Sequence, residues 1–178
     1  ARRSMMLINV AQLLKWPVGT TRLHPIDVDH PLQLDDQSVL TLTGGRVRLD
    51  RIPSGILVRG DAEGTLELEC GRCLEPFRAS LRVHFEEEFA PSVDVHTGAP
   101  LPPPGDEMIF VIDQNHILDL SEAIRQNVIA SLPINPLCMP TCAGLCPICG
   151  SNRNLDPCAC PAEAEGNRPF AGLRSLLN

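Results

Sequence analysis

Eight cysteines constrain this chain more than any other feature, because they fall into three tight groups. The groups are Cys70-Gly-Arg-Cys73, Cys138-x3-Cys142-x3-Cys146-Pro-Ile-Cys149 and Cys158-Ala-Cys160. Zinc in closed structural sites takes four ligands in a tetrahedron, and a Cys-x2-Cys turn brings two thiolates to one ion. Pro147 and Gly150 suit such a turn, since proline presets φ and glycine accepts a positive φ. The pattern therefore predicts two zinc ions, each held by four of the eight cysteines.

Three other uses of these cysteines stay open at this point. Disulfides fit the even count, but they belong mainly to small secreted chains, whereas this chain is long enough to build its own core. Four thiolates also suit an iron–sulfur cluster. A redox Cys-x2-Cys pair depends on a lowered thiol pKa, usually at a helix N-terminus, and no helix start follows Cys73. Zinc is the interpretation that the spacing favours.

Length and composition predict an ordinary globular protein. The chain has 178 residues, of which 43% are hydrophobic and 21% are charged. No apolar stretch is long enough to span a membrane, and the short apolar run near the N-terminus lacks a signal-peptide cleavage site. The expected location is the cytoplasm, with no membrane partner. A net charge of −7 argues against a general nucleic-acid binder, DNA included, because phosphate neutralisation drives such binding.

Alternating hydrophobic residues predict a sheet of short, turn-linked strands. The expected strands cover residues 21–28, a hairpin of 39–43 with 46–50 around Gly44-Gly45, a second of 55–59 with 65–69 around residues 61–64, then 77–85 and 108–112. Strands linked by tight turns pair antiparallel, with one face buried. Helices are expected over residues 7–15 and 120–131, the second opened by a capping box at Asp119 and Glu122. The predicted fold class is α+β, a mainly antiparallel sheet with a few short helices and a C-terminal zinc ribbon.

Three parts are expected along the chain. Residues 1–137 form an α+β body that includes the Cys70/Cys73 knuckle and a Pro-rich loop over residues 91–107, which is predicted to be exposed and mobile. Residues 138–162 form a zinc-binding segment. Residues 163–178 form a C-terminal tail with a short helix around residues 170–177. No phosphate-binding Gly-rich loop or catalytic His motif is found in the sequence, so we expect neither an enzyme nor a small-molecule substrate.

Several motifs together resemble the YceD-like family, the large ribosomal RNA subunit accumulation family of bacteria and plastids. They are Cys70-Gly-Arg-Cys-Leu-Glu-Pro-Phe77, a helix from Asp119-Leu120 into Leu132-Pro-x-x-Pro136-Leu-Cys138, Gly144-Leu-Cys-Pro-x-Cys-Gly150-x-Asn152-x-Asn154, and Cys158-x-Cys160. The resemblance spans residues 7–177 and implies a role in the accumulation or processing of 23S rRNA, without a defined catalytic activity. The implied partner is pre-ribosomal 23S rRNA or a large-subunit ribosomal protein. Ala143 departs from relatives that often carry a basic residue there.

The cysteines can be divided between two sites in two ways. In the first, Cys70, Cys73, Cys138 and Cys142 form site 1, while Cys146, Cys149, Cys158 and Cys160 form site 2. In the second, Cys138 through Cys149 form one site, and the terminal pair joins Cys70 and Cys73. The resemblance favours the first, because shorter members of the family keep the Cys-x-Arg-Cys pair and a ligand-like residue at position 138 but lack the later cysteines.

Three functional hypotheses follow. The first is a zinc-stabilised ribosome biogenesis factor that presents the Cys146–Cys160 ribbon, with Arg153, to RNA or to a ribosomal protein. The second is a zinc-ribbon adaptor for proteins, without RNA contact. The third is a thiol oxidoreductase. One sheet face rich in cations is expected to be a solvated face rather than an RNA patch; its residues are Arg46, Arg48, Arg78, Arg82 and His84.

Overall fold

Three long strands form the framework of the protein. In the computed structural model, which describes residues 6–26, 31–35, 38–105, 109–156 and 158–160, β4 (Val39–Ile52), β5 (Gly55–Glu69) and β6 (Pro76–Pro91) make an antiparallel meander. The six-stranded sheet has the order β2-β4-β5-β6-β7, and β3 also pairs with β4. Strands β2 (Thr21–Pro25) and β3 (Pro31–Gln33) share one edge of β4.

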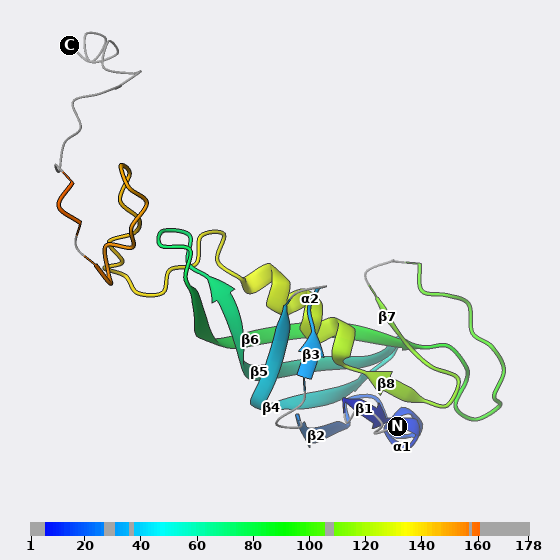
Figure 1. The fold of residues 1–178 in the computed structure, drawn as a ribbon. Helices are drawn as coiled ribbons and strands as arrows, with labels where there is room; N and C mark the ends of the chain where they lie inside the picture. Colours follow the sequence, from blue (N-terminus) through cyan, green and yellow to red (C-terminus); the bar gives the residue numbers. More distant parts are fainter. Residues whose placement is uncertain (1–5, 27–30, 36–37, 106–108, 157, 161–178) are drawn as a thin grey trace, which may run out of the picture.

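Smaller elements complete the described fold. Strand β1 (Leu7–Asn9) pairs antiparallel with β8 (Ile117–Asp119), and β7 (Phe110–Ile112) runs parallel to β6. The helices are α1 (Ala11–Lys15) and α2 (Ser121–Ser131), with α2 lying across one face of the sheet (Figure 1). The prediction of a mainly antiparallel sheet with few short helices is confirmed, with β6–β7 as a parallel exception.

The hydrophobic core lies between α2 and the inner face of the sheet. Alternate residues of β4 and β5 point into it, including the fully buried Leu49 and Val58, and Ile124 of α2 belongs to the same cluster. An amide of α2 also reaches the sheet, where Asn127 Nδ2 donates to Glu87 Oε1 over 2.7 Å. The cysteines Cys70, Cys73 and Cys142 form a separate buried cluster, outside this core.

The two hairpins predicted within residues 39–69 are wrong, because both segments are continuous strands. Thr41 and Arg46 pair with the same strand, β5, and the register shifts between Leu42 and Gly44. The β-bulge therefore lies between Leu42 and Gly44. Gly45 pairs regularly with Ala62, at a close approach of the two backbones where a Cβ would overlap the backbone oxygen of Asp61. Glycine pairs read as turns locally, but they also serve bulges and close backbone approaches.

The N-terminal helix predicted over residues 7–15 is shorter than expected. Residues 7–9 pair with β8 instead, and the Asn9 Oδ1 atom accepts the Ala11 N–H over 3.1 Å where the helix begins. The strand predicted over residues 21–28 ends at Pro25, since Ile26 is described but is not part of it, and residues 27–28 lie outside the described part. The helix predicted around residues 170–177 also lies outside the described residues.

Helix α2 agrees with its prediction, but its start differs in detail. Asp119 ends β8 and its carboxylate accepts the Ser121 N–H over 2.8 Å. Glu122 turns away from the helix start and accepts hydrogen bonds from Arg125 and Gln126. The expected reciprocal capping box is therefore wrong, because the Arg125 guanidinium is a stronger partner for a carboxylate than a backbone N–H.

The Pro-rich segment predicted as a mobile loop over residues 91–107 is hydrogen-bonded in its described part. Pro91 still belongs to β6, Val93 forms a bridge with Pro100, and the Leu101 N–H donates to Ser92 O over 2.9 Å. Asp94 fixes the turn between them, since its carboxylate accepts the Thr97 N–H over 2.7 Å. The proposed division of the chain at residues 137 and 138 stays a prediction.

Candidate metal centres

The first Cys-x2-Cys pair forms the tip of the β5–β6 hairpin. Glu69 and Pro76 are the last paired residues of the two strands, so Cys70 and Cys73 lie in the loop between them. The Leu74 N–H donates to Cys70 O over 2.9 Å, and Leu74 has a φ of +60°. This backbone conformation turns both cysteine side chains to the same side.

The segment that follows α2 brings Cys138 and Cys142 to this hairpin tip. The Gly71 N–H donates to Pro136 O over 2.8 Å, and Arg72 Nη1 donates to Cys142 O over 3.0 Å. Figure 1 shows this segment beside the end of the hairpin, beyond the sheet. The Sγ atoms of Cys70, Cys73, Cys138 and Cys142 all lie within 4.8 Å of one another.

The sulfur spacing of this first group matches a tetrahedral metal site. The Sγ atoms of Cys70 and Cys142 are 3.8 Å apart, as are those of Cys73 and Cys138. A zinc–sulfur bond of about 2.3 Å in a regular tetrahedron gives a sulfur–sulfur distance of about 3.8 Å. The first group therefore has the size that zinc requires.

The second group is built around the other Cys-x2-Cys pair. The Gly150 N–H donates to Cys146 O over 2.9 Å, and Gly150 has a φ of +73°. This is the same turn as in the first group, with Gly150 in the place of Leu74, so the predicted left-handed glycine is confirmed. The Sγ atoms of Cys146, Cys149, Cys158 and Cys160 lie within 4.8 Å of one another.

The two groups differ in their exposure to solvent. Cys70, Cys73 and Cys142 of the first group are buried, and Cys138 is half-buried. In the second group only Cys146 is buried, while Cys149 is exposed and its Sγ lies 2.9 Å from Ser151 Oγ. Of the two divisions of the cysteines considered from the sequence, the sulfur atoms gather as in the first.

Hydrogen bonds and burial oppose each other among the thiols of the first group. The backbone N–H of Cys138 bonds the Cys70 sulfur and lowers the pKa of Cys70 to about 6. Burial raises the pKa of Cys138 to about 12. Burial also opposes ionisation of Cys142, but bonds from the Gly144 N–H and the Asn154 amide outweigh it and lower the pKa of Cys142. Within this group, the surroundings therefore favour ionisation of Cys70 and Cys142 and oppose ionisation of Cys138.

The second group shows the same division. The Ser151 hydroxyl lowers the pKa of Cys149 to about 6, and the Cys149 sulfur in turn raises the pKa of Cys160 to about 12. Four thiolates within a few ångströms repel one another, so neighbouring negative charge keeps some of them protonated. A bound dication removes this repulsion and allows all four thiols to ionise. Each group can therefore hold a metal ion.

The cationic sheet face carries carboxylates between its cations. Arg59 Nη1 lies 3.0 Å from Asp50 Oδ2, and Arg59 Nε lies 2.7 Å from Glu86 Oε2. Further ion pairs on this face join Arg48 to Asp50 and Arg82 to Glu63, and the His84 ring contacts the Asp61 carboxylate. On the predicted solvated face, most of the basic side chains are therefore already paired with a carboxylate.

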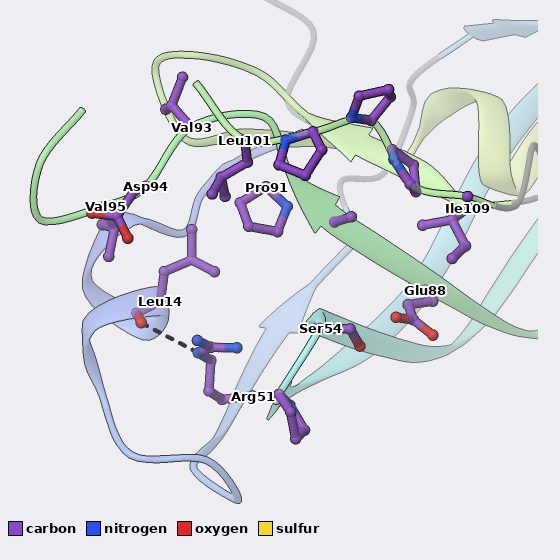
Figure 2. A pocket seen from close by; sticks show the side chains of 16 residues that line it. Leu14, Arg51, Ser54, Glu88, Pro91, Val93, Asp94, Val95, Leu101 and Ile109 are labelled. Carbon is purple, nitrogen blue, oxygen red and sulfur yellow. Dashed lines mark hydrogen bonds between the residues drawn. The ribbon is translucent and has the colours of Figure 1, made fainter. Parts of the chain in front are cut away.

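A pocket of about 530 Å³ lies beside the Pro-rich segment, at the other end of the sheet from the cysteines (Figures 1 and 2). Its charged lining includes Arg51, whose Nε donates to Leu14 O over 3.2 Å and whose Nη1 donates to Gly55 O over 2.9 Å. The Asp94 carboxylate is occupied by the turn at Thr97. These groups hold the fold together, and among the described residues neither cysteine nor histidine lines the pocket.

Sequence reasoning missed two residues that hold Cys142: Arg72, from the loop of the first group, and Asn154, from the loop of the second. Arg72 and Asn154 contact Cys142 through its carbonyl oxygen and its sulfur, at 3.0 and 3.3 Å. The sequence motif does contain Asn152 and Asn154. No local pattern, however, indicates which atoms these two side chains contact.

Comparisons with known proteins support one family. A family model described as large ribosomal RNA subunit accumulation protein YceD matches residues 58–177. An uncharacterized protein of Mycobacterium tuberculosis is 32% identical over 158 residues, which cover 83% of this chain and 70% of that protein. A maize protein named large ribosomal RNA subunit accumulation protein YCED homolog 1, chloroplastic, is 28% identical over 158 residues, covering 75% of this chain and 51% of its own length.

No solved structure matches the chain. Among the described residues, no helix is both long and apolar enough to cross a membrane. The family match begins within β5 and continues through both cysteine groups, so it includes every residue of the candidate metal centres. The chain therefore belongs to the YceD family of large ribosomal RNA subunit accumulation proteins.

Proposed function

We propose that this protein is a non-catalytic ribosome biogenesis factor that supports the accumulation or processing of 23S rRNA and the assembly of the large subunit in the cytoplasm. The observation that carries the proposal is the family match, which extends over both cysteine groups. The name of the maize relative refers to the accumulation of large-subunit RNA.

Zinc is the metal we assign to both groups, through Cys70, Cys73, Cys138 and Cys142 and through Cys146, Cys149, Cys158 and Cys160. Every donor is a thiolate, and the spacing of 3.8 Å between the sulfurs of Cys70 and Cys142 suits a tetrahedral ion. Four protein ligands leave no open coordination position for substrate or water, so the metal supplies structural stabilisation rather than catalysis.

The ribbon from Cys146 to Cys160 is the surface that we assign to the partner, pre-ribosomal 23S rRNA or a large-subunit ribosomal protein. Arg153 is exposed there, and the same segment exposes the apolar side chains of Ile148 and Leu155, at 48% and 70%. A net charge of −7 disfavours a broad phosphate-binding surface, so the contact is local.

A depletion and complementation experiment tests this function. Cells that lack the native protein receive the wild-type chain or the double variant Cys146→Ser/Cys149→Ser, with Gly44→Ala as the control because a Cβ at Gly44 meets no atom within 4 Å. Wild type and control should restore the ratio of 23S to 16S rRNA and the large-subunit peak in sucrose gradients, and the double variant should not. Unchanged rRNA and subunit profiles after depletion would refute the proposal.

A protein adaptor without RNA contact is the second candidate. The observation that favours it is the ion-paired sheet face, where Arg59 already contacts both Asp50 and Glu86. Ultraviolet cross-linking in cells separates the two candidates, since a biogenesis factor that touches RNA recovers rRNA fragments through Arg153 or its neighbours. Recovery of protein alone selects the adaptor.

A thiol oxidoreductase is the third candidate, and one observation favours it. Cys149 is exposed, and its pKa is lowered to about 6 by the Ser151 hydroxyl. Alkylation of the zinc-loaded chain distinguishes the two roles, because metal ligands are protected and a catalytic thiol reacts quickly. Protection of all eight cysteines excludes this candidate.

A further inference from the structure

Asn154 belongs to the loop of the second cysteine group, between Cys149 and Cys158, but its side chain contacts the first group. Its Nδ2 atom donates a hydrogen bond to the Cys142 sulfur over 3.3 Å. Sulfurs that ligate metals are held and tuned by such donors, which lie just outside the coordination sphere. The chain thus places a partner for one metal group on the loop that carries the other.

The orientation of the Asn154 amide is fixed by its other contacts. Its Oδ1 atom accepts the Ala143 N–H over 2.8 Å, so the opposite orientation would set an NH2 group against an N–H. The second hydrogen of Nδ2 goes to Asn152 Oδ1 over 2.8 Å, and the same oxygen accepts the Asn154 backbone N–H over 3.0 Å. The Nδ2 group of Asn154 therefore faces Cys142, and both its hydrogens and the Oδ1 atom have hydrogen-bond partners.

The backbone around Asn154 is anchored on the first group as well. The Arg153 N–H donates to Gly144 O over 2.9 Å, and the Leu145 N–H donates to Arg72 O over 3.2 Å. Gly144, with a φ of +69°, approaches so closely that a Cβ there would lie 3.1 Å from Arg72 O. The knuckle of the first group and the loop of the second are thus parts of one hydrogen-bonded unit.

We propose that Asn154 is a positioning residue that couples the two metal groups. When the second group is occupied, its loop is ordered and holds the Asn154 amide on the Cys142 thiolate, which strengthens metal binding at the first group. Because coupling between binding sites is reciprocal, occupancy of the first group strengthens the second by the same factor. The proposal rests on metal binding by both groups, as in the proposed function.

The test uses the full-length, zinc-loaded chain and measures each group separately. A chelator of known zinc affinity is titrated in, and released thiols are trapped by alkylation and mapped by mass spectrometry to the peptides of either group. The variants are Asn154→Ala, Cys158→Ser and the two combined. Arg153→Ala is the matched control, because Arg153 is the exposed neighbour of Asn154.

Asn154→Ala should weaken zinc binding at the first group by about 10- to 100-fold, the usual effect of removing such a partner. Cys158→Ser, which removes a ligand of the second group, should weaken the first group as well. The combined variant should weaken the first group no more than the larger single change, because both substitutions interrupt the same connection. Arg153→Ala should leave both groups as in the wild type.

Asn154→Asp separates positioning from a general loss of structure. It keeps the size of the side chain and an acceptor for the Ala143 N–H, but it sets a carboxylate oxygen against the Cys142 thiolate. The first group should then bind zinc more weakly than in Asn154→Ala, with unchanged circular dichroism of the sheet. Equal first-group affinity in wild type, Asn154→Ala and Asn154→Asp overturns the coupling alone, and a wild-type chain that binds no metal overturns the metal assignment as well.

Discussion

Gly71 packs directly against the side chain of Asn135, so that a Cβ at residue 71 would overlap the Asn135 Oδ1 atom. The Gly71 N–H also donates to the carbonyl of the next residue, Pro136, over 2.8 Å. This contact seats the tip of the β5–β6 hairpin on the segment that delivers Cys138. The first metal group therefore depends on a residue that is not a ligand.

Gly71→Ala should weaken the first group without disturbing the sheet. The added methyl must displace the end of the exposed Asn135 side chain, which can rotate away, so the cost should lie below the roughly 1–3 kcal/mol of overpacking a buried core. We expect faster zinc release from the first group, measured by chelator competition, and a normal far-ultraviolet spectrum. Gly44→Ala is the control, because a Cβ there meets no atom within 4 Å. Equal release rates for the two variants would contradict the packing argument.

Substitution of the residue after each Cys-x2-Cys pair should affect zinc affinity differently in the two groups. Leu74 and Gly150 occupy the same left-handed conformation, with φ of +60° and +73°. A side chain there costs roughly 1–2 kcal/mol. Gly150→Leu should therefore weaken zinc binding at the second group, whereas Leu74→Gly should leave the first group at least as tight. Isothermal titration of zinc into the metal-free variants measures both, and a loss of affinity on Leu74→Gly would show that its side chain matters more than its backbone.

Phe89→Ala should test the main core separately from the metal groups. Phe89 is 1% exposed and stacks on Phe110 with 5.1 Å between ring centroids. Truncating a buried phenylalanine costs about 3–5 kcal/mol of unfolding free energy, so the urea midpoint should fall steeply. Val111→Ala is the control, because Val111 follows Phe110 in β7 and is 54% exposed. This substitution should change the urea midpoint little. Zinc stoichiometry should be the same in both folded variants.

Glu122 should make a small contribution to stability that is lost in acid. Hydrogen bonds from Arg125 lower its pKa from 4.5 to about 2, so the unfolded chain binds the proton more readily. The contribution is present above the unfolded pKa and disappears as pH falls through the folded pKa. Because the side chain is 49% exposed, solvent limits the effect to about 0.5 kcal/mol. The melting temperatures of wild type and Glu122→Gln should differ at pH 6 and converge near pH 2.

Removal of zinc should unfold the cysteine end and leave the sheet intact. The buried residues Cys70, Cys73 and Cys142 form a cluster apart from the main core, which holds residues such as Leu49 and Ile124. Hydrogen exchange after chelation should therefore rise in residues 70–74 and 138–160 and stay slow in the middle of β4 and β5. A single loss of protection across the whole chain would instead show that the metal supports the core.

Several features of this structure follow from local patterns in the sequence. The alternation along residues 77–85 marks a strand because successive side chains point to opposite faces, and the structure extends this strand over Pro76–Pro91. The recurrence of apolar residues every four positions after Asp119 marks α2 in the same way. Gly150 marks a left-handed turn because glycine has no Cβ to clash.

Other features depend on contacts between distant residues. Gly44 and Gly45 have the signature of a turn, yet both lie within β4, where Gly44 follows a bulge and Gly45 pairs with Ala62 of the long strand β5. Local propensity cannot distinguish these outcomes, because a neighbouring strand decides whether the backbone turns or continues. The parallel pairing of β7 with β6 is likewise set by the path of the Pro-rich segment.

The sequence by itself determined that this chain contains two sets of four cysteines suited to a tetrahedral metal, since ligand type and the Cys-x2-Cys spacing are local properties. Only the tertiary structure decided which sulfurs meet and what joins the sets. The register of β5 with β6 places Cys70 at the hairpin tip, where residues more than sixty positions later reach it. The bond from Asn154 to Cys142 exists because two loops fold against each other, a relationship set by packing in space rather than by spacing along the chain.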